Sequence, residues 1–174
     1  YRRQRQMCIR DRLSYLAAHG SVLYVSSYSG LRIFDLTDPL APVEMPLLHE
    51  TSGLLHVEGD LLYFVGDPFK VWDLSDPRAP VEISSCPGQW SGDVDFEGGL
   101  ALTGSSYGGA CLYDVSDPTA IRELAVFHTP SRADAVLLED ETAYVMDRSR
   151  GVYVYDLRTP DSPVCRGLYA VSYT

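Results

Sequence analysis

The sequence predicts an all-β protein made of four successive repeats, each with four short antiparallel strands. Three observations lead to this prediction. An aspartate recurs at intervals of 38, 41 and 42 residues, each time between an apolar segment and a proline-containing turn. Short runs of β-branched and aromatic residues alternate with turn residues along the chain, which is typical of strands and leaves no place for helices. The 174 residues, 45% of them hydrophobic, are enough for a globular core.

The recurring aspartates define the repeat. They lie in the segments IFDLTDPLAPVE, VWDLSDPRAPVE, LYDVSDPTAIRE and VYDLRTPDSPVC, where they are Asp35, Asp73, Asp114 and Asp156. A period of about 40 residues with four strands is typical of the blades of a β-propeller. We therefore expect one domain over residues 13–170, with blades at 13–50, 51–88, 89–130 and 131–170.

Within a repeat, the strands follow from the apolar runs between turn residues. In the second and fourth repeats the predicted strands are Leu54–Glu58, Leu61–Val65, Phe69–Leu74, Val81–Ser85, Ala133–Glu139, Thr142–Met146, Gly151–Leu157 and Val164–Tyr169. The first hairpin turn of a repeat uses residue pairs that tolerate a positive φ, namely Gly59-Asp60, Gly98-Gly99 and Asp140-Glu141. Each repeat is thus expected to be a four-stranded meander.

The four recurring aspartates have a structural explanation. Each closes the third strand of its repeat, where its carboxylate is expected to accept backbone N–H groups of the following turn. The hydroxyls of Thr37, Ser75 and Ser116 are expected to accept such bonds too. A second proline, at Pro42, Pro80 and Pro163, suits a strand at the outer edge of a sheet. The ligand alternation of calcium-binding loops is missing, so we interpret these aspartates as turn residues.

These segments resemble the LVIVD repeat of bacterial and archaeal propellers. The resemblance is carried by Leu31-Arg32-Ile33-Phe34-Asp35-Leu36-Thr37-Asp38-Pro39, and by Arg132-Ala133-Asp134-Ala135-Val136 followed by Ala143-Tyr144-Val145. It covers residues 13–170 and implies a propeller that usually has more than four blades, so we expect an incomplete ring. The fourth repeat departs from the pattern at Arg158-Thr159, and the third at Ile121. Signals of other propeller families are weaker, since a Trp-Asp dipeptide occurs only at Trp72-Asp73.

Both ends of the chain differ from the repeats. Codons for Cys8–Asp11 can be chosen whose reverse complement encodes residues 171–174, so we expect residues 1–12 and 171–174 to derive from a sequencing adapter. The alternative is a basic N-terminal arm. A four-blade arc would expose the apolar faces of its terminal blades, and we expect the chain alone to oligomerise or aggregate.

Charge and cysteine content narrow the classes of partner and cofactor. The net charge is -10, and residues 1–12 contribute +4, which leaves -14 for the remainder. This charge disfavours nucleic acid and anionic lipid surfaces, and no apolar run is long enough to span a membrane. Outside residues 1–12 the cysteines Cys86, Cys111 and Cys165 show neither metal-ligand spacing nor a disulfide framework. We expect no cofactor and no metal.

The sequence contains none of the common catalytic motifs. The best candidates for a ligand site lie in and beside the connections from a fourth strand to the next first strand, which would rim one mouth of the propeller: His49, Trp90, Asp93, His128, Arg132 and Asp134. We predict a non-catalytic binding or scaffold domain for a protein or carbohydrate-like ligand. The family resemblance implies a secreted or cell-surface location. The alternative is a propeller enzyme whose channel site is completed by blades missing here.

Overall fold

A computed structural model describes residues 13–46, 48, 52–89, 91–106 and 108–170. The predicted adapter segments, 1–12 and 171–174, lie outside the described residues. Sixteen strands form in the described part: β1 Leu13–His19, β2 Val22–Ser27, β3 Gly30–Asp35, β4 Val43–Glu44, β5 Leu54–Glu58, β6 Leu61–Val65, β7 Phe69–Asp73, β8 Val81–Cys86, β9 Ser91–Glu97, β10 Leu100–Ser105, β11 Ala110–Asp114, β12 Arg122–Phe127, β13 Ala133–Glu139, β14 Thr142–Asp147, β15 Gly151–Asp156 and β16 Val164–Tyr169.

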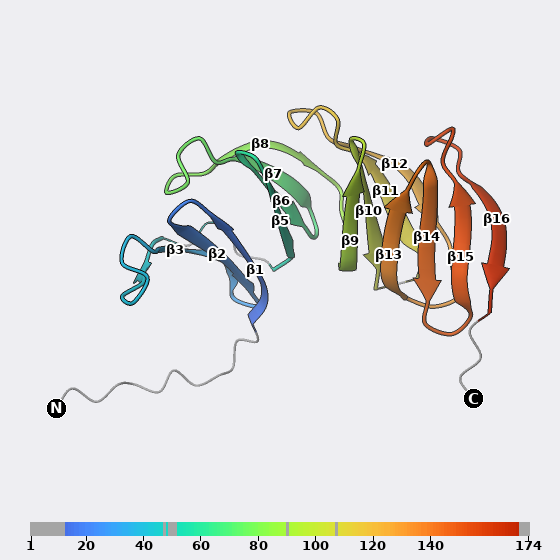
Figure 1. The fold of residues 1–174 in the computed structure, drawn as a ribbon, viewed down its shortest axis with the longest axis horizontal. Coiled ribbons are helices and arrows are strands. Elements are labelled where there is room, and N and C mark those ends of the chain that lie inside the picture. Colours follow the sequence, from blue (N-terminus) through green and yellow to red (C-terminus); the bar gives the residue numbers. More distant parts are fainter. Residues whose placement is uncertain (1–12, 47, 49–51, 90, 107, 171–174) are drawn as a thin grey trace.

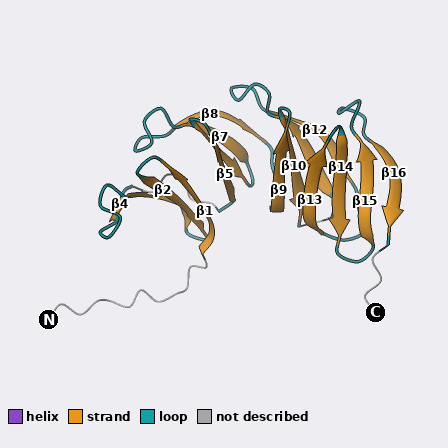
Figure 2. Ribbon diagram, viewed as in Figure 1, coloured by secondary structure: helices purple, strands orange, loops and turns teal. Residues whose placement is uncertain are grey.

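The strands form four separate antiparallel sheets of four strands, each made of consecutive strands in order (Figure 2). We call them sheets 1 to 4, from β1–β4 to β13–β16. The all-β prediction with four four-stranded sheets is confirmed. Of the strands predicted in the second and fourth repeats, none differs from the structure by more than one residue at either end. No helix that could span a membrane is present among the described residues.

Turn chemistry sets the first hairpin of each sheet. Asp140 and Glu141 both have positive φ, at 47° and 59°, and so do Gly98 and Gly99, at 57° and 80°. In the hairpin of sheet 2 only Gly59 has positive φ, at 55°, and its partner Asp60 does not. Two-residue loops with positive φ match the right-handed twist of the flanking strands. These turns therefore fix the register of the two strands that they join.

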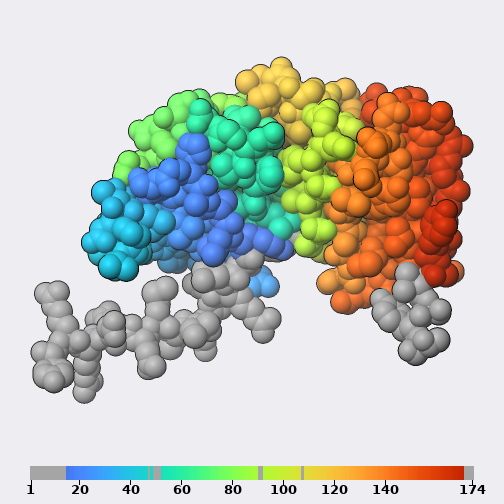
Figure 3. Space-filling view, in the orientation of Figure 1, coloured from blue at the N-terminus to red at the C-terminus, as the bar shows by residue number. Residues whose placement is uncertain are grey.

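The sheets follow one another along an arc (Figure 1). Their first strands, β1, β5, β9 and β13, lie toward the inside of the arc, and their last strands lie toward the outside. In the space-filling view, sheets 1 and 4 form the two ends of the arc (Figure 3). Sheets 2 and 3 thus have one face toward the preceding sheet and one toward the following sheet, whereas sheets 1 and 4 each have a neighbouring sheet on one face only among the described residues.

Three hydrophobic clusters fill the spaces between successive sheets. Between sheets 1 and 2, the rings of Phe64 and Trp72, both on sheet 2, lie edge-on with centroids 5.7 Å apart, in one cluster with Tyr24 of sheet 1. Between sheets 2 and 3, Phe69 meets Tyr113 edge-on at 5.0 Å. Between sheets 3 and 4, Phe127 meets Tyr155 at 4.5 Å. The cores therefore lie between the sheets, and burial of these aromatic and aliphatic side chains stabilises the stack.

Polar groups also tie neighbouring sheets together. On β9, Asp93 and Asp95 accept the backbone N–H groups of Val136 and Leu138 on β13, at 3.0 and 2.7 Å. Between sheets 1 and 2, the Tyr24 hydroxyl donates to a backbone carbonyl in the turn after β7, at 2.7 Å. These bonds satisfy partly buried groups and orient sheet 4 on sheet 3 and sheet 2 on sheet 1.

Candidate binding site at the loop end of the fourth sheet

The recurring aspartates form hydrogen bonds inside their own turns. The Oδ1 atoms of Asp35 and Asp73 accept the backbone N–H two residues later, both at 2.7 Å. Asp114 and Asp156 do the same at 3.1 and 3.0 Å. These are the contacts that the sequence predicted for the carboxylates.

The expectation for the neighbouring hydroxyls was wrong in direction. Thr37, Ser75 and Ser116 do not accept backbone N–H groups at these turns; each hydroxyl donates to the same aspartate Oδ1 at 2.6 Å. An ionised carboxylate has several lone pairs and no proton, so it is the stronger acceptor of the pair. In the fourth repeat Arg158 stands in place of the hydroxyl and donates to Asp156 through its guanidinium.

Arginine side chains donate further hydrogen bonds to the aspartate in three of the four turns. Arg78, from the turn of sheet 2, reaches Asp35 of sheet 1 with its Nε at 2.8 Å. Arg122 donates to Asp114 at 2.9 Å, and Arg166 joins Arg158 on Asp156. The Arg78 guanidinium and the Thr37 hydroxyl hold the pKa of Asp35 well below its usual range. These carboxylates are thus engaged by the fold itself.

We expect acid to destabilise the chain through these turns. Because the folded-state pKa of Asp35 is depressed, its stabilising contribution is present above the unfolded-state value of about 3.9 and is lost as the pH falls through the folded-state value. Thermal melts between about pH 6 and about pH 2 should show a falling Tm. Asp35→Asn should melt lower than the wild type near neutral pH and lose less Tm on acidification. An unchanged acid dependence in this variant would contradict the assignment.

The residues predicted to line a ligand site lie in different environments in the structure. His49 and Trp90 lie outside the described residues. Asp93 is committed to the backbone of β13, as described above, and His128 is exposed at the start of the β12–β13 connection. Arg132 and Asp134 are brought together by an ion pair. Only this last pair remains as the centre of a site.

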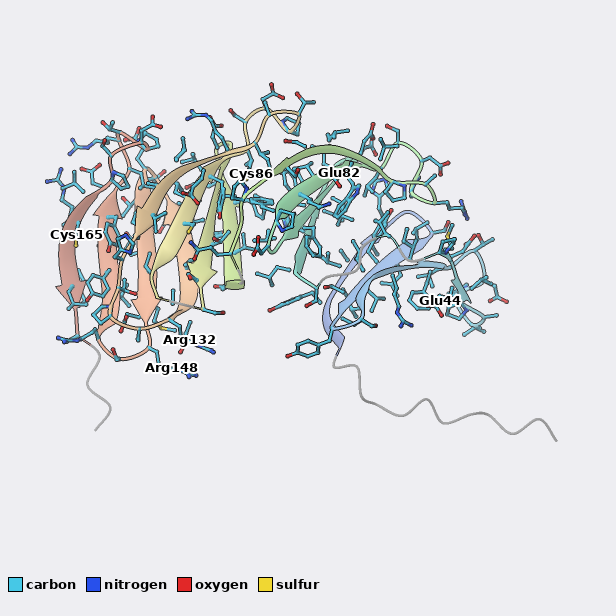
Figure 4. All side chains as sticks on the ribbon, turned by 180° about the vertical axis from the view of Figure 1, so that it is seen from behind. Glu44, Glu82, Cys86, Arg132, Arg148 and Cys165 are labelled. Atoms are coloured by element: carbon cyan, nitrogen blue, oxygen red, sulfur yellow. The ribbon has the colours of Figure 1, made fainter. Side chains whose placement is uncertain are left out.

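Asp134 holds two arginines at once. Arg132 donates through Nε to Oδ1, and Arg148 donates through Nε to Oδ2 at 3.0 Å. The ion pair with Arg132 is the main reason that the pKa of Asp134 lies below its ordinary value. Arg148 comes from the β14–β15 hairpin, and its side chain is 61% exposed. Figure 4 shows Arg132 and Arg148 together at this end of sheet 4.

A buried carboxylate fixes the two loops that carry these arginines. Asp147, 2% exposed, ends β14 and accepts the backbone N–H groups of Ser131, Ser149 and Arg150, at 2.7, 2.8 and 2.8 Å. Burial opposes ionisation of Asp147, but bonds from Ser131 and Ser149 outweigh it and lower its pKa. The Arg148 N–H also donates to the Arg132 carbonyl at 3.1 Å. The β12–β13 connection and the β14–β15 hairpin therefore form one rigid unit.

The described cations divide into two groups. Six use the terminal nitrogens of their side chains in ion pairs within the fold: Arg32, Lys70, Arg78, Arg122, Arg158 and Arg166. For the other three, Arg132, Arg148 and Arg150, no described residue pairs with the terminal Nη groups. All three lie at the end of sheet 4 that carries the β12–β13 connection and the β14–β15 hairpin. We call this set the arginine cluster.

A groove lies between sheets 2 and 3, at the end of the strands opposite to the arginine cluster. This groove has a volume of about 430 Å³ and is lined by Tyr63 and Phe96, whose ring centroids are 5.1 Å apart, and by Glu58 and Glu97. Its lining residues come from strands and turns of two different repeats, so the groove could not be predicted from the sequence. Across the described part of the chain, no group of three or more His, Cys, Asp or Glu side chains is placed to hold a metal ion.

Comparisons with known proteins bear on the fold alone. No family model matches the chain, and no curated protein matches it. The solved structure of the computationally designed Ika4 protein is similar, with a TM-score of 0.65 and 14% identity over 85% of this chain and 92% of that chain. The computationally designed Ika8 protein is also similar, with a TM-score of 0.63 and 15% identity over 84% of this chain. This chain spans only 46% of the length of Ika8.

Proposed function

We propose that the chain is a β-propeller domain with a binding or scaffold role and without catalysis, and that its four sheets are blades of the LVIVD-repeat type. The position of the four first strands on the inside of the arc supports this proposal. So do the hydrophobic clusters between successive sheets, since the blades of a propeller pack face to face around an axis.

The observation that carries a binding role is the arginine cluster. Loops on a rigid scaffold commonly carry recognition, and the bonds to Asp147 make these loops rigid. Asp134 orients two guanidinium groups through Nε, which leaves their terminal N–H groups for a ligand. Guanidinium groups match carboxylates in geometry and charge. We infer that the ligand presents a carboxylate, as an acidic loop of a partner protein or an acidic sugar does.

Titration with an acidic probe tests this role. We expect a tetraglutamate peptide to shift the backbone amide signals of residues 128–134 and 147–151 in NMR spectra of the ¹⁵N-labelled chain. Arg148→Gln should weaken binding about tenfold or more, because a hydrogen bond between charged groups contributes about 1.5–3 kcal/mol. An oligouronate titrated in parallel separates a sugar from a peptide as the preferred source of the carboxylate.

The matched control is Arg122→Gln. It removes an equal charge from sheet 3, at the end of the strands opposite to the arginine cluster. It should bind the probe as the wild type does. The binding role fails if both probes leave the amides of these loops unchanged, or if Arg148→Gln and Arg122→Gln weaken binding equally.

A further inference from the structure

The outward face of sheet 4 has the residues of an inter-sheet core. Counted from the recurring aspartate, Val152 and Val154 on β15 occupy the positions of Ala110 and Leu112 on β11. Ala110 and Leu112 are 0% exposed because sheet 4 covers them. Val152 and Val154 are only half-buried, and no further sheet covers them among the described residues.

The two most exposed large apolar side chains of sheet 4, Leu137 and Tyr169, lie on that same face. Leu137 pairs with Tyr144, which pairs with Val154, so these three side chains share one face of the sheet. Leu137 is 49% exposed, and Tyr169 is 69% exposed. Phe127, the equivalent of Tyr169 in sheet 3, is 3% exposed. The fourth sheet therefore presents one half of an inter-sheet interface.

Sheet 1 presents the other half. Its face away from sheet 2 includes Leu16, which is 61% exposed, and Leu36, which is half-buried. Their equivalents in sheet 4, Val136 and Leu157, are 8% and 2% exposed because they pack on sheet 3. The two ends of the arc are thus complementary in the way that consecutive sheets inside the chain are.

The turn after β3 in sheet 1 also lacks a preceding sheet to contact in the described part of the chain. Arg78, five residues after Asp73, reaches back to the turn of the preceding sheet and binds Asp35. Leu40, five residues after Asp35, holds the equivalent position and is 94% exposed. The position that crosses to a preceding sheet thus carries an apolar side chain without a described neighbour to cover it.

We propose that a second copy of this chain covers both faces, with sheet 4 of each copy packed on sheet 1 of the other. Two arcs joined in this way close into a ring of eight sheets, which lies within the four to eight blades of known propellers. A second copy fits because it supplies both halves of the interface, in the order in which sheets 1 to 4 already follow one another. This inference rests on the proposed propeller arrangement.

Light scattering coupled to size-exclusion chromatography tests the proposal on the purified chain. We expect twice the 19.3 kDa mass of one chain. Leu16→Asp and Leu137→Asp should each give the mass of a single chain, because each variant damages one half of both interfaces in the ring. Val81→Asp is the matched control, since Val81 is 61% exposed at the start of β8, away from both faces, and it should remain dimeric.

Mixing the two variants sharpens the test. Sheet 4 of Leu16→Asp and sheet 1 of Leu137→Asp are both intact, so the mixture should regain the double mass through one undamaged interface. A wild type with the mass of a single chain, or one that forms open polymers, would overturn the proposal. So would a Leu16→Asp variant that remains dimeric, because sheet 4 would then pair with itself. The tetraglutamate titration measures binding at the loops of sheet 4, so its outcome is independent of the mass of the assembly.

Discussion

Asp147→Ala should lower the free energy of unfolding by about 2–4 kcal/mol, because backbone N–H groups lose a charged, buried acceptor. Asp147 accepts N–H groups from both loops of the arginine cluster, and one of these donors, Ser131, is partly buried. The loss should also loosen the two loops, so the tetraglutamate probe should bind more weakly. Urea denaturation at fixed protein concentration measures the first effect, and the NMR titration measures the second.

Glu139→Ala is the control for charge, since Glu139 is exposed on β13 of the same sheet and no hydrogen bond of the described residues involves its side chain. It should change stability by less than about 0.5 kcal/mol. Asp147→Asn keeps one carbonyl acceptor and should fall between the wild type and the alanine variant. Equal stability of Asp147→Ala and Glu139→Ala would show that the three backbone hydrogen bonds to this carboxylate contribute nothing.

Phe69→Ala should cost about 3–5 kcal/mol, the largest loss that we expect from one substitution. The Phe69 ring is 0% exposed between sheets 2 and 3, where it lies against Tyr113 at 5.0 Å and Tyr63 at 6.5 Å. Its removal leaves a cavity between two sheets whose backbones are held by their own ladders, so the space cannot collapse fully. Urea denaturation followed by far-ultraviolet circular dichroism measures the loss.

Val81→Ala provides the comparison, because Val81 is an apolar strand residue of the same sheet that is 61% exposed. Its loss should stay below about 0.5 kcal/mol. If Phe69→Ala were as stable as Val81→Ala, the cluster between sheets 2 and 3 would not be a core that supports the fold.

Much of the fold could be predicted from the sequence because its signals are local. A two-residue turn such as Asp140-Glu141 is specified by adjacent residues, and its positive φ values follow from the same pair. The aspartate turn is similar, since Asp73 binds groups only two residues away. These local signals recur in all four repeats, so the strand content follows from the sequence without knowledge of the packing.

The candidate site could be predicted only in part, because it depends on contacts between distant residues. Asp134 and Arg132 lie two residues apart and could be predicted from the sequence, whereas Arg148 reaches Asp134 from a hairpin fourteen residues away. Asp147 carried a weak signal, in that the second strands of sheets 1 and 3 also end on a buried polar residue, Ser27 and Ser105. The pairing of six cations inside the fold, which singles out the arginine cluster, follows from side-chain geometry alone.

The direction of the hydroxyl bonds illustrates the same limit. A serine two residues after an aspartate predicts a contact in the turn, but a hydroxyl can donate or accept. In the structure the aspartate Oδ1 receives both the N–H and the hydroxyl of Ser75, so the carboxylate is the single acceptor of the turn. The strength of an ionised acceptor decides the outcome, and spacing in the sequence does not encode it.

A crystal structure of the purified chain would show whether the four sheets are consecutive blades of a propeller. We expect β1, β5, β9 and β13 to surround a common axis and each sheet to pack on its neighbours in chain order. Sheets that pair edge to edge, or that stack two against two as a sandwich, would contradict this expectation.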